Sequence, residues 1–162
     1  MSTPGLNKSY GWVIALVSFC ILAVSTGTVL SFGVFLKPLL AEFGWTRGQI
    51  SLAYSLNWIV FGIFSPFFGI LSDRFNIRIV VQLGGIIYGT GMILAAQTRT
   101  LWQLYIFFGV MTGMGMSAFF APLMAMIMKW AGRRSGLAVG LISSGSGVGT
   151  LVIPSLARYF IS

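Results

Sequence analysis

The chain has 162 residues, of which 57% are hydrophobic and only 7% are charged, and its mean hydropathy is +0.94. A soluble domain carries roughly a quarter charged residues, so the composition predicts a membrane protein. The net charge of +8 comes from ten basic and two acidic residues, which are scattered singly or in pairs between apolar runs. They form no basic stripe of the kind that binds a phosphate backbone, which excludes nucleic acid as the expected partner.

The sequence contains no histidine and a single cysteine, Cys20. The usual zinc and haem ligands and the commonest general base are therefore missing. One cysteine cannot form an intrachain disulfide, and its place in an apolar run is typical of a small packing residue. We expect no metal site, no cofactor and no enzymatic activity.

Five apolar runs are each long enough to cross a bilayer, which takes roughly 20 residues; they cover 12–36, 50–71, 79–96, 101–128 and 136–157. Because lipid satisfies no backbone groups, long runs without alternation predict helices rather than a barrel. The expected fold is an all-α membrane protein with five transmembrane helices, and the expected partner is the lipid bilayer.

Orientation is predicted from the basic residues in the short connectors. With the N-terminus inside, six basic residues fall on the cytoplasmic side and four outside: Lys8, Arg74, Arg78, Lys129, Arg133 and Arg134 against Lys37, Arg47, Arg99 and Arg158. The two closest groups of basic residues, one at 74–78 and one at 129–134, both fall on the cytoplasmic side. We expect a multi-pass protein of the plasma membrane (the inner membrane in a bacterium) with a cytoplasmic N-terminus.

The connector between the second and third runs carries one of the two acids, Asp73, between Gly69 and the basic residues Arg74 and Arg78. Such charges are unfavourable in lipid and re-pair easily outside it, which indicates a gate. The alternative is an ordinary basic connector with one acid for solubility. Asn76 is expected in the left-handed conformation that Asn tolerates.

The candidate substrate cavity lies in the second run, where Tyr54, Trp58 and Phe61 share one helical face and Asn57 lies next to it. An amide in mid-span should face protein or water. The alternative to a cavity is hydrogen bonding between helices by Asn57 and simple packing by the rings.

Glycines four residues apart predict close helix contacts, as at 85 and 89, 109 and 113, 136 and 140, and 145 and 149. The segment around Gly145, Gly147 and Gly149 contains more small residues than close packing alone requires. It is therefore predicted to let the last helix bend or slide.

The pattern of Gly69, Asp73, Arg74 and Arg78 resembles the connector between the second and third helices of major facilitator superfamily transporters. Asn76 stands where that family has Gly, and Ile77 where it usually has a basic residue. Residues 9–12, and 129–130 with 133–140, resemble motifs of the monocarboxylate porters. Residues 35–38 and 42–45 resemble bacterial relatives that include oxalate/formate-exchanger-like proteins.

The resemblance implies that residues 1–162 form part of a major facilitator N-terminal domain, with five helices covering most of that half. It implies alternating-access transport of a small organic anion such as a monocarboxylate. In the family the matching Asp contacts the second half, so Asp73 would need a missing C-terminal half or a partner chain. We expect the 162 residues to be inactive alone.

One feature departs from the family, and a second bears on proton coupling. Animal monocarboxylate porters carry a lysine in the first helix, whereas this chain has Val29, Leu30 and Ser31 around that position. The runs also hold no acid near mid-membrane, so proton coupling through them is not predicted. The alternative function is a multi-span membrane interaction or assembly protein, or a remnant without transport; a dimerising half-transporter is a further one.

Overall fold

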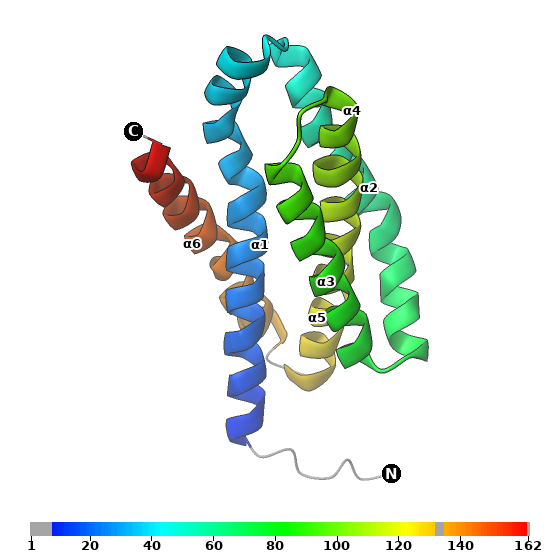
Figure 1. Ribbon diagram of the computed structural model, residues 1–162. Helices are drawn as coiled ribbons and strands as arrows, with labels where there is room; N and C mark the ends of the chain where they lie inside the picture. Colours follow the sequence, from blue (N-terminus) through cyan, green and yellow to red (C-terminus); the bar gives the residue numbers. More distant parts are fainter. Residues whose placement is uncertain (1–7, 132–134, 162) are drawn as a thin grey trace. The chain divides into compact units, whose positions relative to one another are not determined.

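The computed structural model describes residues 8–131 and 135–161 as a set of helices (Figure 1). In chain order these are α1 (Lys8–Phe43), α2 (Arg47–Arg74), α3 (Ile77–Ala96), α4 (Leu101–Leu104), the π-helix η1 (Tyr105–Met111), α5 (Thr112–Ala131) and α6 (Ser135–Ile161). Side chains are not described at 8–15, 37, 127, 129–131 and several positions of α6. Because α4, η1 and α5 follow without a break, they form one continuous helix. The expected all-α fold is confirmed.

Four helices in the described part are long and apolar enough to cross a membrane, namely Leu16–Leu36, Arg47–Arg74, Ile77–Ala96 and Leu101–Met126. They coincide with the first four expected spans, with ends that differ by a few residues. The fifth expected span, 136–157, coincides with α6, where several side chains lie outside the described residues. The count of five spans and the assignment of 1–162 to one partial domain stay predictions.

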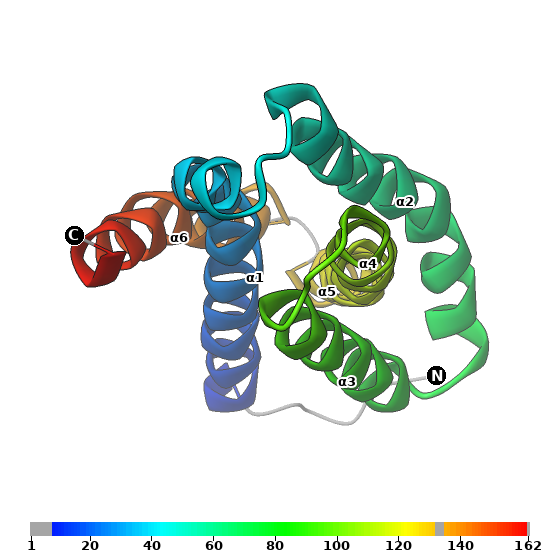
Figure 2. The ribbon, with the colours of Figure 1, turned by 45° about the horizontal axis from the view of Figure 1, so that its top comes forward.

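The described residues form two compact units, one of residues 31–122 and one of the segments 8–30, 123–131 and 135–161. Within the first unit, residues 101–122 of the continuous helix lie between α2 and α3 (Figure 2). A Cβ at Gly109 would lie 2.8 Å from Leu56 Cδ2, and one at Gly113 would lie 2.7 Å from the backbone oxygen of Asn57. These two glycines therefore allow η1 and α5 to lie directly against α2.

The α3 side of the same helix is equally close. A Cβ at Gly84 would lie 2.6 Å from Ala118 Cβ, and Gly91 likewise lies against η1. The pair expected from the spacing, Gly85 and Gly89, does not make this contact, because Gly89 has no described atom within 4 Å of a Cβ position. Each residue turns a helix by about 100°, so a shift of one position moves a glycine off the contact face.

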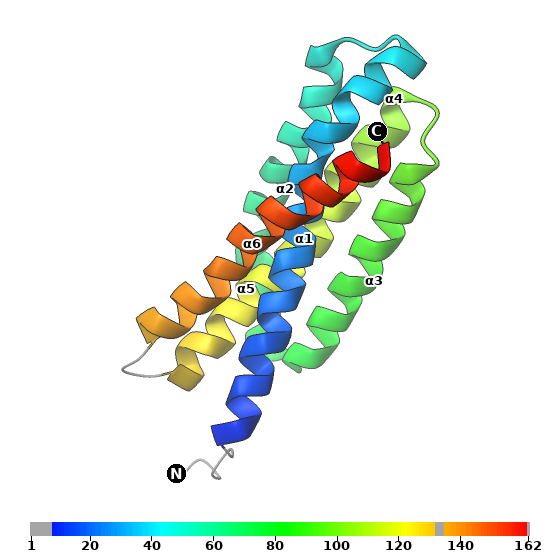
Figure 3. The same cartoon turned by 90° about the vertical axis from the view of Figure 1, so that its left-hand side faces the viewer.

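In the second unit, residues 8–30 of α1 lie beside α6 (Figure 3). A Cβ at Gly145 would lie 2.8 Å from the backbone oxygen of Phe19, and one at Gly149 would overlap the backbone of Ala23. Gly147 has no described atom within 4 Å of its Cβ position. Gly145 and Gly149 thus lie at the close approach of α6 to α1, whereas Gly147 does not; the flexibility proposed for the segment stays a prediction.

The connector between α2 and α3 is a tight turn of two residues. The backbone N–H of Phe75 donates to Leu71 O at 2.9 Å, which closes the last turn of α2. Asn76 is the N-cap of α3, and its side-chain Oδ1 accepts the backbone N–H of Arg78 at 3.1 Å. An N-cap satisfies one of the backbone donors that a helix start leaves unpaired.

The left-handed conformation expected for Asn76 is wrong. Its φ is −63° and its ψ is 121°, which is extended backbone. Among the described residues only Gly44, in the turn between α1 and α2, has a positive φ, of 64°. Asn76 differs from the family's glycine because its side chain caps α3, a role that needs an acceptor and no unusual backbone angle.

We predict that Gly149→Ala lowers the thermal stability of the chain in detergent micelles, because the added methyl group overlaps the Ala23 backbone and forces α6 away from α1. Overpacking of this kind costs about 1–3 kcal/mol. Gly147→Ala is the matched control and should be neutral or slightly stabilising, since it has open space and alanine favours a helix by about 1 kcal/mol over glycine. Thermal unfolding followed by circular dichroism measures both; equal effects would contradict the contact.

A second prediction concerns the cap of α3. Asn76→Ala should lower stability by about 1 kcal/mol, Asn76→Gly by only a few tenths, and Asn76→Asp should stay near the unchanged chain, in the order expected for an N-cap. Faster hydrogen exchange at the Arg78 amide, which loses its acceptor, should accompany the alanine variant. A glycine variant more stable than the unchanged chain would point instead to a left-handed residue.

Candidate functional site

Aromatic rings of the unit 31–122 form a continuous series that we call the aromatic ladder, in the order Phe108, Phe32, Tyr54, Trp58, Phe61 and Phe120. Phe108 and Phe32 are stacked with ring centroids 4.2 Å apart, and Phe32 and Tyr54 are stacked at 6.2 Å. The next three pairs meet edge to face at 6.3, 5.7 and 5.6 Å. The ladder therefore joins α1, α2, η1 and α5 through one set of ring contacts.

Burial varies along the ladder. Phe108 and Phe32 are buried, Tyr54, Phe61 and Phe120 are half-buried, and Trp58 is 38% exposed. The three cavity candidates on α2 are thus brought together in the accessible part of the ladder. Aromatic faces and edges of this kind bind apolar and planar groups, and the tyrosine hydroxyl adds a polar group to the same surface.

Asn57 lies on a different face of α2 and is completely buried. Its Nδ2 donates to Phe108 O at 2.9 Å and to Thr112 Oγ1 at 2.6 Å. The hydroxyl of Thr112 in turn donates to Phe108 O. The alternative of hydrogen bonding between helices is what the structure shows, and contact of Asn57 with a substrate stays a prediction. Its Oδ1 has no hydrogen-bond partner among the described residues.

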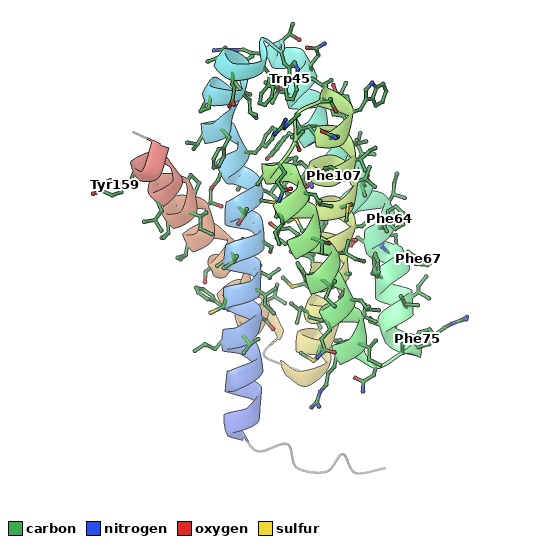
Figure 4. All side chains as sticks on the ribbon, viewed as in Figure 1. Trp45, Phe64, Phe67, Phe75, Phe107 and Tyr159 are labelled. Atoms are coloured by element: carbon green, nitrogen blue, oxygen red, sulfur yellow. The ribbon has the colours of Figure 1, made fainter. Side chains whose placement is uncertain are left out.

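Two further aromatic residues, Phe67 of α2 and Phe75 directly after it, point away from the helices of their unit (Figure 4). Phe67 is 58% exposed and Phe75 is 60% exposed, and Figure 4 shows both on the outer side of α2. Large apolar side chains on the outside of a span are suited to contact with lipid. The ladder is distinguished from these residues by its ring-to-ring contacts across helices.

The gate candidates occupy one end of the α2–α3 pair. Asp73 and Arg74 lie in the last turn of α2, and Arg78 lies in the first turn of α3, all with exposed side chains. Gly69 lies one turn earlier, and a Cβ there would be 3.9 Å from Ala121 Cβ, which is ordinary contact. Space therefore does not require glycine at 69, and the gating role of all four residues stays a prediction.

The interiors of the second, third and fourth described spans carry no charged residue. The sequence has no Asp, Glu, Lys or Arg between Ile50 and Leu71, between Ile79 and Ala96, or between Leu101 and Met126. Among the described residues, no three His, Cys, Asp or Glu side chains come together. The ladder can therefore supply shape and apolar contact, but it supplies no full charge to a ligand.

Sequence reasoning missed several residues that the structure brings to this region, namely Phe32, Phe108, Thr112 and Phe120. Ring contacts between distant helices leave no local signal in the sequence. A faint signal existed for Thr112, because a polar residue between Gly109 and Gly113 lies in the middle of a helix face that packs closely. The π-helix η1 itself had no signal at all.

Parts of two motifs lie outside the described residues. For residues 9–12 only the helical backbone is described, and residues 132–134 of the second motif are not described.

Comparison with known proteins agrees with the all-helical membrane fold. The sequence model of the Major Facilitator Superfamily matches residues 12–162. Monocarboxylate transporter 12 from Homo sapiens is 28% identical over 160 residues, which are 99% of this chain and 31% of that protein. Monocarboxylate transporter 13 from Bos taurus is 31% identical over 156 residues, which are 96% of this chain and 37% of that protein.

Monocarboxylate transporter 7 from Homo sapiens is 29% identical over 139 residues, which are 86% of this chain and 27% of that protein. The chain therefore spans about a third of the length of these relatives. The resemblance to monocarboxylate porters expected from the motifs is confirmed. Since the family match covers nearly the whole sequence, this chain belongs to the Major Facilitator Superfamily.

Proposed function

We propose that the chain is part of a membrane transporter that moves a small organic anion, such as a monocarboxylate, by alternating access. The observation that carries the proposal is the family match over residues 12–162, together with relatives that are named monocarboxylate transporters. Membership of a transporter family also favours this reading over an enzyme. Transporters of this superfamily bind substrate between two halves that rock against each other.

The accessible part of the aromatic ladder is the proposed wall of the substrate site. Tyr54, Trp58 and Phe61 are held in line by edge-to-face contacts, and Phe32 and Phe120 support the two ends from α1 and α5. Rings fixed from both sides present a rigid apolar surface, which binds the apolar part of a substrate with little loss of side-chain freedom. The positive charge that pairs with the carboxylate would come from another part of the full transporter or from a partner chain.

The connector of Asp73, Arg74 and Arg78 is the proposed gate. The capped, two-residue turn between α2 and α3 fixes these side chains at one end of the helix pair. In a full transporter, a helix N-terminus or a cation of an opposing half would meet the Asp73 carboxylate, and such a contact contributes up to about 2 kcal/mol when partly buried. Breaking and remaking it accompanies the change between inward-open and outward-open states.

The distribution of basic residues supports a cytoplasmic N-terminus in a plasma membrane. The gate would then lie on the cytoplasmic side.

The transport proposal is tested with a chimera in which residues 1–162 replace the matched segment of Bos taurus monocarboxylate transporter 13. We expect saturable uptake of at least one of lactate, formate or oxalate into vesicles that contain the chimera. Trp58→Leu should raise KM roughly two- to tenfold, because one aromatic contact contributes about 0.5–1.5 kcal/mol. Trp102→Leu, an exposed tryptophan outside the ladder, is the matched control and should leave KM unchanged.

The same vesicles with the 162-residue chain alone should show no saturable uptake, since the chain would supply only one wall of the site. Clear uptake by the chain alone would contradict the need for a second half. A correctly inserted chimera that transports none of the three anions would count against the substrate class.

The gate is tested in the same chimera. Asp73→Asn removes the charge while keeping the shape, so the exchange rate should fall at unchanged KM, since the state that Asp73 stabilises becomes less populated. Glu42→Gln is the matched control, because Glu42 is the other acid of the chain and is also exposed. Equal effects of the two substitutions would show that net charge, and not the position of Asp73, matters.

A further inference from the structure

The π-helical segment η1 changes which backbone groups pair in the fourth span. The backbone N–H of Thr112 donates to Phe107 O, five residues back. In an α-helix that N–H would donate four residues back, to Phe108 O. The Phe108 carbonyl therefore loses the donor that a regular helix would give it.

An unpaired carbonyl is costly inside a membrane, where no water can replace the missing donor. Phe108 O is instead paired by side chains, Asn57 Nδ2 at 2.9 Å and the hydroxyl of Thr112. Both side chains are fully buried, and Asn57 also donates to Thr112 Oγ1. The amide of α2 thus takes the place of the backbone donor that the π-helix diverts.

The contact depends on the close approach of two helices. Asn has a short side chain, and it reaches across to the fourth span because Gly113 lies against the backbone of Asn57 itself. Gly109 lies against Leu56 in the same way. The hydrogen bond is therefore part of the α2 interface and not a chance contact of a long side chain.

The register of η1 also decides where Phe108 points. A π-helix accommodates one more residue than the α-helix that it replaces. If η1 returned to α-helical pairing, the residues that follow it would turn by about 100° about the helix axis relative to the residues that precede it. The Phe108 ring, now stacked at 4.2 Å on Phe32 and through it on Tyr54, would leave the end of the ladder.

We propose that Asn57 is a positioning residue, which holds the fourth span in its π-helical register and thereby places Phe108 at the end of the aromatic ladder. Only the link from the ladder to a substrate rests on the proposed transport function. The control of helix register by Asn57 stands on the hydrogen bonds alone and is measured without any transport assay.

The test uses the whole chain in detergent micelles and reports on the Thr112 amide. Met-Thr occurs once in the sequence, at Met111 and Thr112, so labelling methionine carbonyls with ¹³C and threonine amides with ¹⁵N gives one resolved signal. Deletion of Ile106, an exposed residue of η1, removes the extra residue and provides the reference position for a continuous α-helix. Asn57→Leu should move the signal from its original position to that reference position.

Ser117→Ala is the matched control, because Ser117 is also fully buried but bonds only within its own helix, to Met114 O at 2.7 Å. It should leave the Thr112 signal in place. A purely structural role of Asn57 would lower stability without moving the signal. A folded Asn57→Leu variant whose Thr112 signal stays at its original position would overturn the proposal.

Thermal unfolding gives a second readout. It compares four proteins: the unchanged chain, Asn57→Leu, the Ile106 deletion, and the variant that carries both changes. Asn57→Leu should lower the melting temperature strongly in the original chain and much less after the deletion, where the Phe108 carbonyl has regained a backbone donor. If the single variant fails to fold, a folded double variant supports the proposal and an unfolded one overturns it. Equal losses in both backgrounds, or a deletion variant that cannot fold, would likewise overturn it.

Discussion

The pairing of one backbone carbonyl, that of Phe108, organises the middle of this protein. Inside a bilayer every backbone group must find its partner within the protein, and the π-helix η1 leaves this carbonyl without its usual N–H. The amide of Asn57 supplies the partner from another helix. A polar residue that would be unfavourable in lipid is thus stabilised by a defect in the neighbouring helix, and the defect is stabilised by the polar residue.

Small residues allow the helices to come close enough for the hydrogen bond between Asn57 and the Phe108 carbonyl. Gly109 and Gly113 bring α2 against the fourth span, and Gly84 and Gly91 bring α3 against its other side. Between transmembrane helices there is little hydrophobic driving force, so close packing and hydrogen bonds carry the association. The fourth span is therefore held on two sides, which gives the rings attached to it, Phe108 and Phe120, fixed positions in the ladder.

The sequence was sufficient for features that depend on composition or on spacing along one helix. Apolar runs predicted the spans, and the spacing of Tyr54, Trp58 and Phe61 placed them on one face, where their rings do meet. Features that depend on a single residue of register were out of reach. The π-helix and the use of Gly84 in place of Gly85 depend on contacts between segments, and no local pattern encodes them. The extended backbone of Asn76 has a local cause, because its side chain caps α3 by accepting the Arg78 amide.

Two neighbouring faces of α2 differ in burial and in what they contact. Asn57 is buried and its Nδ2 donates to the fourth span, whereas Trp58, one position along, is accessible. The sequence has no Asp, Glu, Lys or Arg in 16–36, 50–71, 79–96 or 101–126, and the charges of the α2–α3 pair lie near its connector and at the start of α2. For the proposed transporter, this part of the protein would then select substrates by shape and apolar surface. Recognition of the carboxylate would fall to groups outside these spans, so substrate charge and substrate shape would be read by different parts of the molecule.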